Sequence, residues 1–511
     1  MRILFVVSEI IISEPLGILL LSSICKKNGY ETKLCALNQD DLNHQILTYR
    51  PDLIAYSAMT ADIKQFKEFD LTYSHIFKEL ESIRIMGGAH PTYFPDILDE
   101  MLLDAICIGE GDNAISRICD KIIMKRALTG IPNVISKEDR TLTKELIKNL
   151  DTFPLPDRDI LYQARPHYKL LGLRSVLTAR GCAFKCSYCY VHSFNKMFKG
   201  LGDTVRRRDP VAIINELKLV IESDKNTRLI RFADDTFIYS VDEWFLEFSK
   251  LYKNEINLPF YCLMRSNTFT EEIARILSEM GCISVGMSIE SGNAQMRSKI
   301  LKRYIPDKTI LESFRLAKKY HINTYANSMI ALPGGSFKED LITFRFSRDL
   351  KVSAPTFSIF CPYPGLELTD YALENNYLNP DYNYENKYGS PSVLNGFTDQ
   401  EKRMQVRLQH LGPLFCVLPR FFTPLLLLLL LKLPLTSFYH KIGAIFEVFI
   451  LSTRVFKNIY PRNPFVFLRI AYDSISYAHK SDVKTDNILP VREILTVEGG
   501  ANRDVKRFKN V

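Results

Sequence analysis

The sequence predicts an α/β protein that contains an open parallel sheet, then a partial barrel of six strand–helix units, and then a mainly α-helical region. Short apolar runs alternate with amphipathic stretches over residues 1–130, and the same alternation returns over residues 171–370. Residues 131–170 have no clear period and contain a proline-stiffened stretch, which is typical of a linker. Residues 371–511 lack the alternation and form the apolar C-terminal region.

The composition is that of a globular protein rather than a disordered or secreted one. The 511 residues are 46% apolar and 24% charged, and the net charge of +8 forms no long basic blocks in the first two thirds, so we expect no nucleic-acid partner. The eleven cysteines are scattered, and the N-terminal run MRILFVV is too short for the apolar core of a signal peptide. We therefore expect a cytoplasmic protein, in which closely spaced cysteines more often bind metal than form disulfides.

The first region has the pattern of a Rossmann-like sheet. Ligands of such sheets bind beyond the carboxyl ends of the strands. Three of those ends, after the third, fourth and fifth strands, are rich in glycine and small residues, which let a ligand approach the backbone closely. Each end alone is ordinary turn chemistry, but three at one sheet edge indicate a cofactor site. The expected strands are 2–7, 31–37, 53–57, 83–86 and 105–108, and the clearest helices are 16–28 and 62–80.

The second alternating region predicts a curved parallel sheet. In such barrels, functional residues lie at the carboxyl ends of the strands. The expected strands are 175–180, 228–233, 260–265, 283–289, 322–332 and 356–360, and the clearest helices are 210–223, 241–253, 271–280 and 308–320.

Three cysteines follow the first strand of this barrel. Cys182, Cys186 and Cys189 have the spacing C-x3-C-x2-C in a loop that contains a glycine. Three thiolates at this spacing can ligate three irons of one [4Fe–4S] cluster and leave the fourth iron open to another ligand. A zinc site with His192 as the fourth ligand is the alternative, because structural zinc normally has four protein ligands.

The cysteine loop resembles the signature of the radical S-adenosylmethionine (radical SAM) superfamily, in which an aromatic residue precedes the third cysteine, as Tyr188 does here. The resemblance implies that S-adenosylmethionine chelates the open iron. It also implies that an electron from the cluster, supplied by an external donor such as a flavodoxin or ferredoxin, splits the S–C5′ bond to give a 5′-deoxyadenosyl radical.

The ends of the later barrel strands fit the same resemblance, which implies contacts to S-adenosylmethionine. The acidic motif after the second strand would receive the methionine amino group, unless Asp235 caps a helix. Arg265 on the third strand would hold the carboxylate, unless it forms a surface ion pair. The fourth strand end would bind the ribose and the fifth the adenine. The residues so assigned are Tyr188, Asp234, Asp235, Arg265, Ser288, Glu290, Pro333 and Gly334.

The N-terminal region resembles the cobalamin-binding domain of the class B radical methylases and cyclases. The histidine motif D-x-H-x-x-G, which ligates cobalt in other cobalamin proteins, is absent, so the resemblance implies no lower imidazole ligand from this chain. The alternative is a cofactor-free fold retained for packing. The residues that match the cobalamin-contacting loops are Leu16, Gly17, Ser57, Met59, Thr60, Gly87, Gly88, His90, Gly109, Glu110 and Gly111.

The C-terminal region contains an apolar run over residues 411–431, which approaches the length that spans a bilayer. Prolines and an arginine interrupt it, so we expect one of three alternatives: a buried helical core, an anchor at the inner face of the membrane, or the wall of a greasy substrate tunnel. The flanking cations suit peripheral contact with an anionic membrane surface, and they are Lys432, Lys441 and Arg454.

These features together predict a cobalamin-dependent radical SAM enzyme that methylates an unactivated carbon of a small or lipid-like substrate. One alternative is a cobalamin-dependent radical cyclase or oxidoreductase that transfers no methyl group. Another is a non-catalytic module that binds cobalamin or metal. The alternatives differ in whether 5′-deoxyadenosine and a methylated product form.

Overall fold

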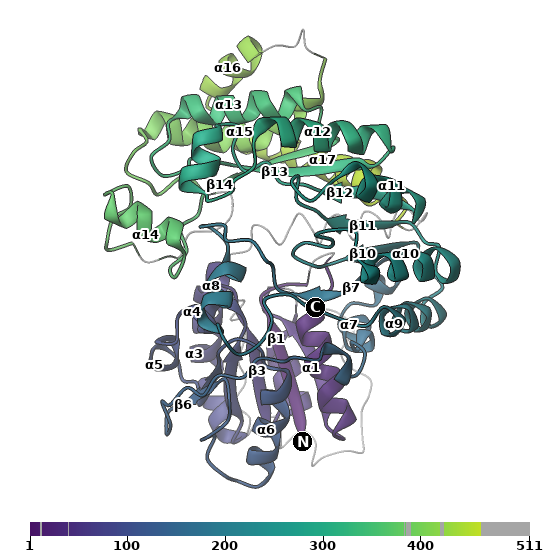
Figure 1. Ribbon diagram of the computed structural model, residues 1–511. Coiled ribbons are helices and arrows are strands. Elements are labelled where there is room, and N and C mark those ends of the chain that lie inside the picture. The colour runs from purple at the N-terminus through teal and green to yellow at the C-terminus, as the bar shows by residue number, and fades with distance from the viewer. Residues whose placement is uncertain (11–12, 39, 383, 385–389, 420–423, 461–511) are drawn as a thin grey trace, which may run out of the picture. The chain divides into compact units, whose positions relative to one another are not determined.

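The computed structural model describes residues 1–460, except 11–12, 39, 383, 385–389 and 420–423 (Figure 1). The described residues form two compact units. The first contains Met1–Ile10 and Leu21–Thr143, and the second begins at Lys144 and also takes in the segment that ends at Leu20.

The first unit is built on a six-stranded sheet with the order β2-β1-β3-β4-β5-β6. All neighbours pair in parallel except β5 and β6. The side chains of β1 from Ile3 to Val7 are buried, as expected for a strand covered on both faces. The strands β1 to β6 are Arg2–Val7, Glu31–Ala36, Leu53–Ser57, Ile83–Gly87, Ala105–Cys107 and Val134–Ser136. The helices between them, α1 to α6, are Leu16–Lys27, Leu42–Tyr49, Ile63–Glu79, Ala89–Tyr93, Ile97–Glu100 and Asp112–Ile123.

The predicted linker 131–170 contains more structure than its sequence indicates. Strand β6 lies in it and adds an antiparallel edge to the predicted parallel sheet, and the short helix α7 (Arg158–Ala164) follows. A three-residue strand is too short to show a periodic pattern, so no local pattern predicts it.

The second unit is built on an open sheet of six parallel strands with the order β14-β13-β12-β11-β10-β7. This confirms the predicted partial barrel. The strands β7 and β10 to β14 are Leu173–Val176, Leu229–Phe232, Phe260–Leu263, Cys282–Gly286, Asn323–Ile330 and Ala354–Ile359, and the helices α9 to α13 that Figure 1 shows along the sheet are Pro210–Ser223, Glu243–Glu255, Glu271–Glu279, Asp307–Lys319 and Phe337–Asp349.

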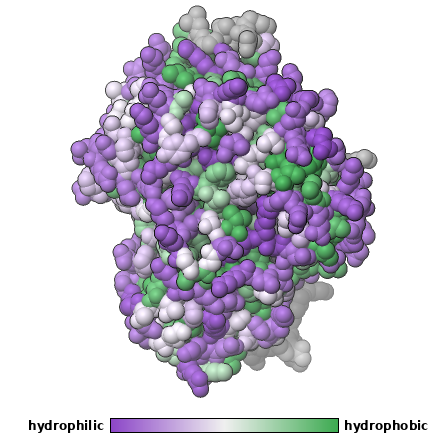
Figure 2. Space-filling model, viewed as in Figure 1, coloured by the Kyte–Doolittle hydropathy of each residue, from purple (hydrophilic) through white to green (hydrophobic). Residues whose placement is uncertain are grey.

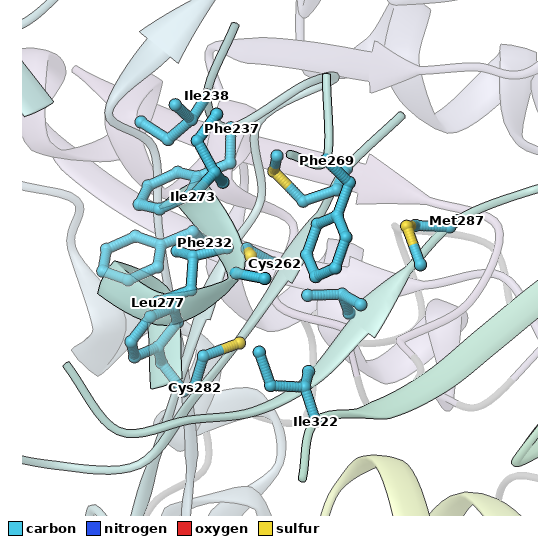
Figure 3. Close-up of a cluster of buried hydrophobic side chains, with 14 of the residues drawn as sticks. Phe232, Phe237, Ile238, Cys262, Phe269, Ile273, Leu277, Cys282, Met287 and Ile322 are labelled. Atoms are coloured by element: carbon cyan, nitrogen blue, oxygen red, sulfur yellow. The ribbon is translucent and has the colours of Figure 1, made fainter. Parts of the chain in front are cut away.

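The core of this unit lies between the sheet and its helices (Figure 3). Phe232 of β10 and Cys262 of β11 point into it from the sheet, and Ile273 and Leu277 of α11 point into it from the helices. Burial of this apolar surface is the main stabilising contribution to the unit, and it fixes the strand ends that carry the site.

The C-terminal helices complete the second unit. Helix α15 packs against β14 and α13. Beyond α17, the Ser284 hydroxyl donates to the carbonyl of Val455 at 2.7 Å, and the amide of Gly172 donates to the carbonyl of Ile459 at 2.6 Å. These contacts lie on the sheet face opposite the core of Figure 3. Helices α14 to α17 are Glu367–Glu374, Asp399–Val417, Pro424–Lys432 and Thr436–Ile450.

The apolar run 411–431 is divided between two helices, because α15 ends at Val417 and α16 begins at Pro424. Over the described part of the chain, no helix has both the length and the hydropathy needed to cross a membrane.

Candidate functional site

The three cysteines lie in one loop at the carboxyl end of the first barrel strand. The predicted strand 175–180 is divided into β7 and the short β8 (Ala179–Arg180), which pairs in antiparallel fashion with β9 (Arg206–Arg207). Gly181 then turns the chain with φ +92°, and a Cβ placed there would lie 2.0 Å from the carbonyl oxygen of Thr204. Only glycine fits this close approach, so Gly181 fixes where the cysteine loop begins.

Several distant segments hold the cysteine loop in place. The Asn195 amide donates to the carbonyl of Cys182 at 2.8 Å. The Tyr239 hydroxyl accepts the amide of Ala183 at 3.3 Å, and the Ser187 hydroxyl donates to the carbonyl of Ile300 at 2.7 Å. The loop is therefore anchored at its start and again near its end.

The thiols have different neighbours. The Arg265 guanidinium donates to Cys186 Sγ at 3.0 Å and lies 4.0 Å from the ring centroid of Phe184. Cys182 Sγ lies 3.6 Å from the Thr236 hydroxyl. Burial raises the pKa of Cys189 to about 11, so this thiol is protonated at neutral pH until iron displaces its proton.

These donors fit an iron–sulfur cluster better than a single metal ion. Among the described residues, no three His, Cys, Asp or Glu side chains converge closely enough to enclose one ion. A cubane cluster keeps its ligands apart because each thiolate binds a different iron, whereas zinc needs four ligands about 2.0–2.3 Å from one point. His192 is paired with Glu367 at 3.3 Å. The described residues thus hold no set of converging ligands for a single zinc ion.

The two aspartates of the acidic motif after β10 lie in different environments. Asp234 is buried, and its Oδ1 accepts hydrogen bonds from the amide and the hydroxyl of Thr178 and from the amide of Ala179. Its Oδ2 has no hydrogen-bond partner, and burial raises the pKa of Asp234 to about 7. Asp235 is exposed. Asp234 therefore positions the strand end before the cysteine loop and keeps one oxygen for a further contact.

Glu290 and Tyr188 meet in a buried polar cluster. The backbone of Glu290 has φ +67°, a left-handed conformation that costs a non-glycine residue ~1–3 kcal/mol and is concentrated at functional sites. Arg303 donates to the Tyr188 hydroxyl at 3.4 Å and to the carbonyl of Ser288 at 2.6 Å, and its guanidinium lies 3.9 Å from Glu290 Oε1. Burial raises the pKa of Glu290, and the Arg303 charge opposes that shift.

The predicted adenine-side turn is held by a buried carboxyl group. Ala331, just before Pro333 and Gly334, has φ +57°, and its amide donates to Asp340 Oδ1 at 2.8 Å. The Gln405 amide of α15 donates to Asp340 Oδ2, also at 2.8 Å. The C-terminal region thus supports the turn from behind.

Sequence reasoning missed the residues that support the site. Arg303 lies outside the strand-end motifs, and Asp340 and Gln405 lie inside helices, so no short motif marks them. A second set of residues that sequence reasoning missed is a polar group on β13 and β14. Asn327 Oδ1 accepts the hydroxyls of Thr356 at 3.1 Å and Ser358 at 3.0 Å across neighbouring strands. The alternation of β13 could have indicated it, because Asn327 lies on the half-exposed face of that strand.

In the first unit, glycine at a strand end allows the loops after β3 and β4 to approach each other closely. Gly88 has φ +100°, and a Cβ there would lie 2.8 Å from the carbonyl oxygen of Ala58. The same carbonyl accepts the amide of His90 at 3.0 Å. His90 is buried, its Nδ1 lies 3.3 Å from the Thr60 hydroxyl, and burial lowers its pKa to about 4.

The loops after β4 and β5 are held by the side chains of Thr92 and Asn133. The Thr92 hydroxyl donates to the carbonyl of Gly88 at 2.8 Å and accepts the amide of Gly109 at 3.0 Å. The Asn133 amide donates to the carbonyl of Glu110 at 3.0 Å.

The first unit therefore brings together most of the predicted cobalamin residues: Ser57, Met59, Thr60, Gly87, Gly88, His90, Gly109, Glu110 and Gly111 lie at the carboxyl ends of β3, β4 and β5. Met59 is 63% exposed there. Small residues and the exposed Met59 thioether leave room at this sheet edge for a large ring such as a corrin. The His90 side chain is buried and does not fill this room. Leu16 and Gly17 begin α1, in the segment grouped with the second unit.

Comparison with known families assigns both units. Residues 176–346, which include the cysteine loop, match the radical SAM superfamily. Residues 11–118 match the B12 binding domain. This chain therefore carries a radical SAM domain and a B12-binding domain. The first implies a [4Fe–4S] cluster and S-adenosylmethionine, and the second implies cobalamin.

Curated relatives cover most of the chain. A Pyrococcus horikoshii protein named an uncharacterized methyltransferase is 29% identical over 71% of this chain and 79% of its own length. The hopanoid C-3 methylase of Methylococcus capsulatus is 24% identical over 69% of this chain and 68% of its own length. The anaerobic magnesium-protoporphyrin IX monomethyl ester cyclase of Rubrivivax gelatinosus is 23% identical over 69% of this chain and 65% of its own length.

Solved structures share the fold. The radical S-adenosylmethionine methyltransferase TsrM from Kitasatospora setae superposes with a TM-score of 0.59 at 16% identity, covering 73% of this chain and 76% of TsrM. The cobalamin-dependent S-adenosylmethionine radical enzyme OxsB superposes with a TM-score of 0.64 at 14% identity, covering 98% of this chain and 80% of OxsB. At these identities the likeness concerns the fold alone.

Proposed function

We propose that this chain is a cobalamin-dependent radical SAM methyltransferase that acts on an unactivated carbon of a small or lipid-like substrate. The observation that carries the proposal is the presence of a radical SAM match and a B12-binding match on one chain, together with relatives that are named methyltransferase and methylase. A hopanoid is a lipid, so the name of the Methylococcus capsulatus relative favours a lipid-like substrate.

When bound, the cluster and S-adenosylmethionine supply a carbon radical that removes a substrate hydrogen, and cobalamin supplies the methyl group. In this proposal, Cys182, Cys186 and Cys189 bind three irons. Glu290 accepts the ribose hydroxyls, because Arg303 beside it offsets the burial of its charge.

Other residues serve binding and orientation. Pro333 and Gly334 contact the adenine, and Ser288 and Asp234 contact the remaining polar groups of S-adenosylmethionine. The polar group around Asn327 lies on the half-exposed face of β13, where it can orient a substrate. We also propose an external one-electron donor, such as a flavodoxin or ferredoxin, and a cytoplasmic location with peripheral contact at the inner face of the membrane.

Anaerobic reconstitution of the full chain tests the proposal. With iron, sulfide and hydroxocobalamin, we expect about four irons and one cobalt per chain. With dithionite and S-adenosylmethionine, we expect 5′-deoxyadenosine even without substrate. The variant Cys182→Ala should reduce its formation to background. Cys361→Ala is the matched control, because Cys361 is a half-buried cysteine outside the loop. Failure of the wild type to form 5′-deoxyadenosine would support a non-catalytic binding module instead.

The likeness to a cyclase favours one alternative, a radical ring formation or oxidation without methyl transfer. S-adenosylmethionine with a deuterated methyl group separates the two reactions. Methyl transfer places the deuterium in the product, and an unlabelled product formed along with 5′-deoxyadenosine would contradict the methyltransferase proposal.

A further inference from the structure

Helices α16 and α17 carry large apolar side chains on their outer side. In α17, Phe438, Ile445 and Phe449 are 56%, 65% and 61% exposed. Residues at positions i, i+7 and i+11 lie on one side of an α-helix. Further leucines of α16 and of the turn before α17 are exposed as well. We call this set the outer apolar face, and its members are Leu426, Leu429, Leu433, Leu435, Phe438, Ile445 and Phe449.

The same two helices are firmly packed on their other side. Leu427 and Leu431 belong to a buried cluster with residues of α13 and α15. The buried Arg407 of α15 donates to the carbonyl of Leu431 at 2.7 Å and to the Thr436 hydroxyl at 3.0 Å. Arg407 therefore fixes the turn between α16 and α17. The outer apolar face is thus a fixed surface, whose exposure does not result from unpacked helices.

The segment that carries this face has a positive net charge. Between Pro424 and Val455 the sequence contains three cationic side chains, those of Lys432, Lys441 and Arg454, and a single carboxyl group, that of Glu447. The segment also contains His440. Lys432 and Lys441 are exposed. Lys441 follows Phe438 by three residues and so borders the apolar stripe, whereas Glu447 follows Phe438 by nine residues, half a turn away on the opposite side. The cations therefore accompany the apolar face and the carboxyl group does not.

We propose that the outer apolar face binds peripherally to a membrane that contains anionic lipid. Apolar side chains with lysines beside them match the acyl chains and the negative headgroups of such a surface. A second copy of the chain fits less well, because two copies of this face carry the same positive charge and repel each other. Figure 2 shows that the visible surface is mostly hydrophilic with separate hydrophobic areas.

Vesicle sedimentation of the reconstituted full chain tests this proposal. We expect binding to vesicles of phosphatidylcholine with phosphatidylglycerol and at least tenfold weaker binding to phosphatidylcholine alone. The triple variant Leu429→Ser/Phe438→Ser/Phe449→Ser should reduce binding to the acidic vesicles at least tenfold. Its matched control is Leu219→Ser/Leu246→Ser/Leu311→Ser, which removes leucines exposed to a similar degree on other helices. That control should bind as the wild type does.

A charge variant separates the electrostatic contribution. Lys432→Glu/Lys441→Glu should weaken binding to the acidic vesicles by roughly 25-fold or more, since each lysine contributes about fivefold near such a surface. Binding that is equal in all variants would overturn the proposal. So would a wild type that binds no vesicles and forms dimers that the triple variant abolishes, because the face would then be an interface between copies. Formation of 5′-deoxyadenosine is measured in parallel, so loss of membrane binding is distinguished from loss of the proposed reaction.

Discussion

Replacing Gly181 by alanine should prevent the cysteine loop from forming a stable cluster site. The variant meets two obstacles. Alanine in the left-handed conformation costs ~1–2 kcal/mol, and the structure places Gly181 there with φ +92°. The new Cβ would also lie 2.0 Å from the carbonyl oxygen of Thr204, and relief of such overpacking costs ~1–3 kcal/mol. The sum is about 2–5 kcal/mol.

Gly200 provides the matched control. It also has a positive φ, +87°, but a Cβ there would meet nothing within 4 Å. Gly200→Ala therefore carries only the conformational cost of ~1–2 kcal/mol. The difference between the variants isolates the close approach of Gly181 to Thr204, about 1–3 kcal/mol. Because the residue before Cys182 must move to relieve the contact, most of that cost should appear as loss of bound cluster.

The assay is iron and sulfide content after anaerobic reconstitution, with thermal unfolding of the cluster-free chain measured beside it. We expect Gly200→Ala to retain wild-type iron content and Gly181→Ala to retain less than half of it, with a Tm lower by about 2 °C or more than that of Gly200→Ala. Equal iron content and equal Tm in the two variants would refute the reasoning, since the contact with Thr204 would then impose no constraint on the loop.

Three further predictions concern the neighbours of the site. Arg265→Gln removes a cation that favours the more negative, reduced cluster, so its midpoint potential should fall by roughly 60 mV or more in an electron paramagnetic resonance titration, whereas Arg265→Lys should fall less. Burial raises the pKa of Asp340 to about 7, so its stabilising contribution is complete below about pH 4 and is lost as the pH rises to about 7. The Tm of the wild type should therefore decline relative to that of Asp340→Asn between about pH 4 and 7, and parallel Tm curves over that range would contradict this. Gly88→Ala should weaken hydroxocobalamin binding in spectrophotometric titration without changing iron content, because its Cβ would clash with Ala58; unchanged cobalamin affinity would contradict the expected role of this strand end.

Many of these features were predictable from the sequence because they depend on short-range patterns. Apolar runs of strand length alternate with helical periods, and the ends of the first five strands agree with the prediction to within one residue. The spacing of Cys182, Cys186 and Cys189 is likewise a local property, and the match over residues 176–346 confirms the domain that it indicated. The assigned roles of the single residues that contact S-adenosylmethionine and cobalamin remain predictions.

The tertiary structure alone decided which side chains support these motifs. Arg265, whose contact with the carboxylate of S-adenosylmethionine stays a prediction, donates to Cys186 in the folded chain. Asp234, whose contact with S-adenosylmethionine also stays a prediction, accepts hydrogen bonds from Thr178 and Ala179 with one of its oxygens. The sequence does not tell which leucines of α16 are buried, and packing buries one side of the helix and leaves the other exposed. Such partners lie tens of residues apart, so no local pattern encodes them. The sequence by itself determined the two domains and the cysteine loop, and long-range packing determined how that loop is held and which apolar surface stays outside.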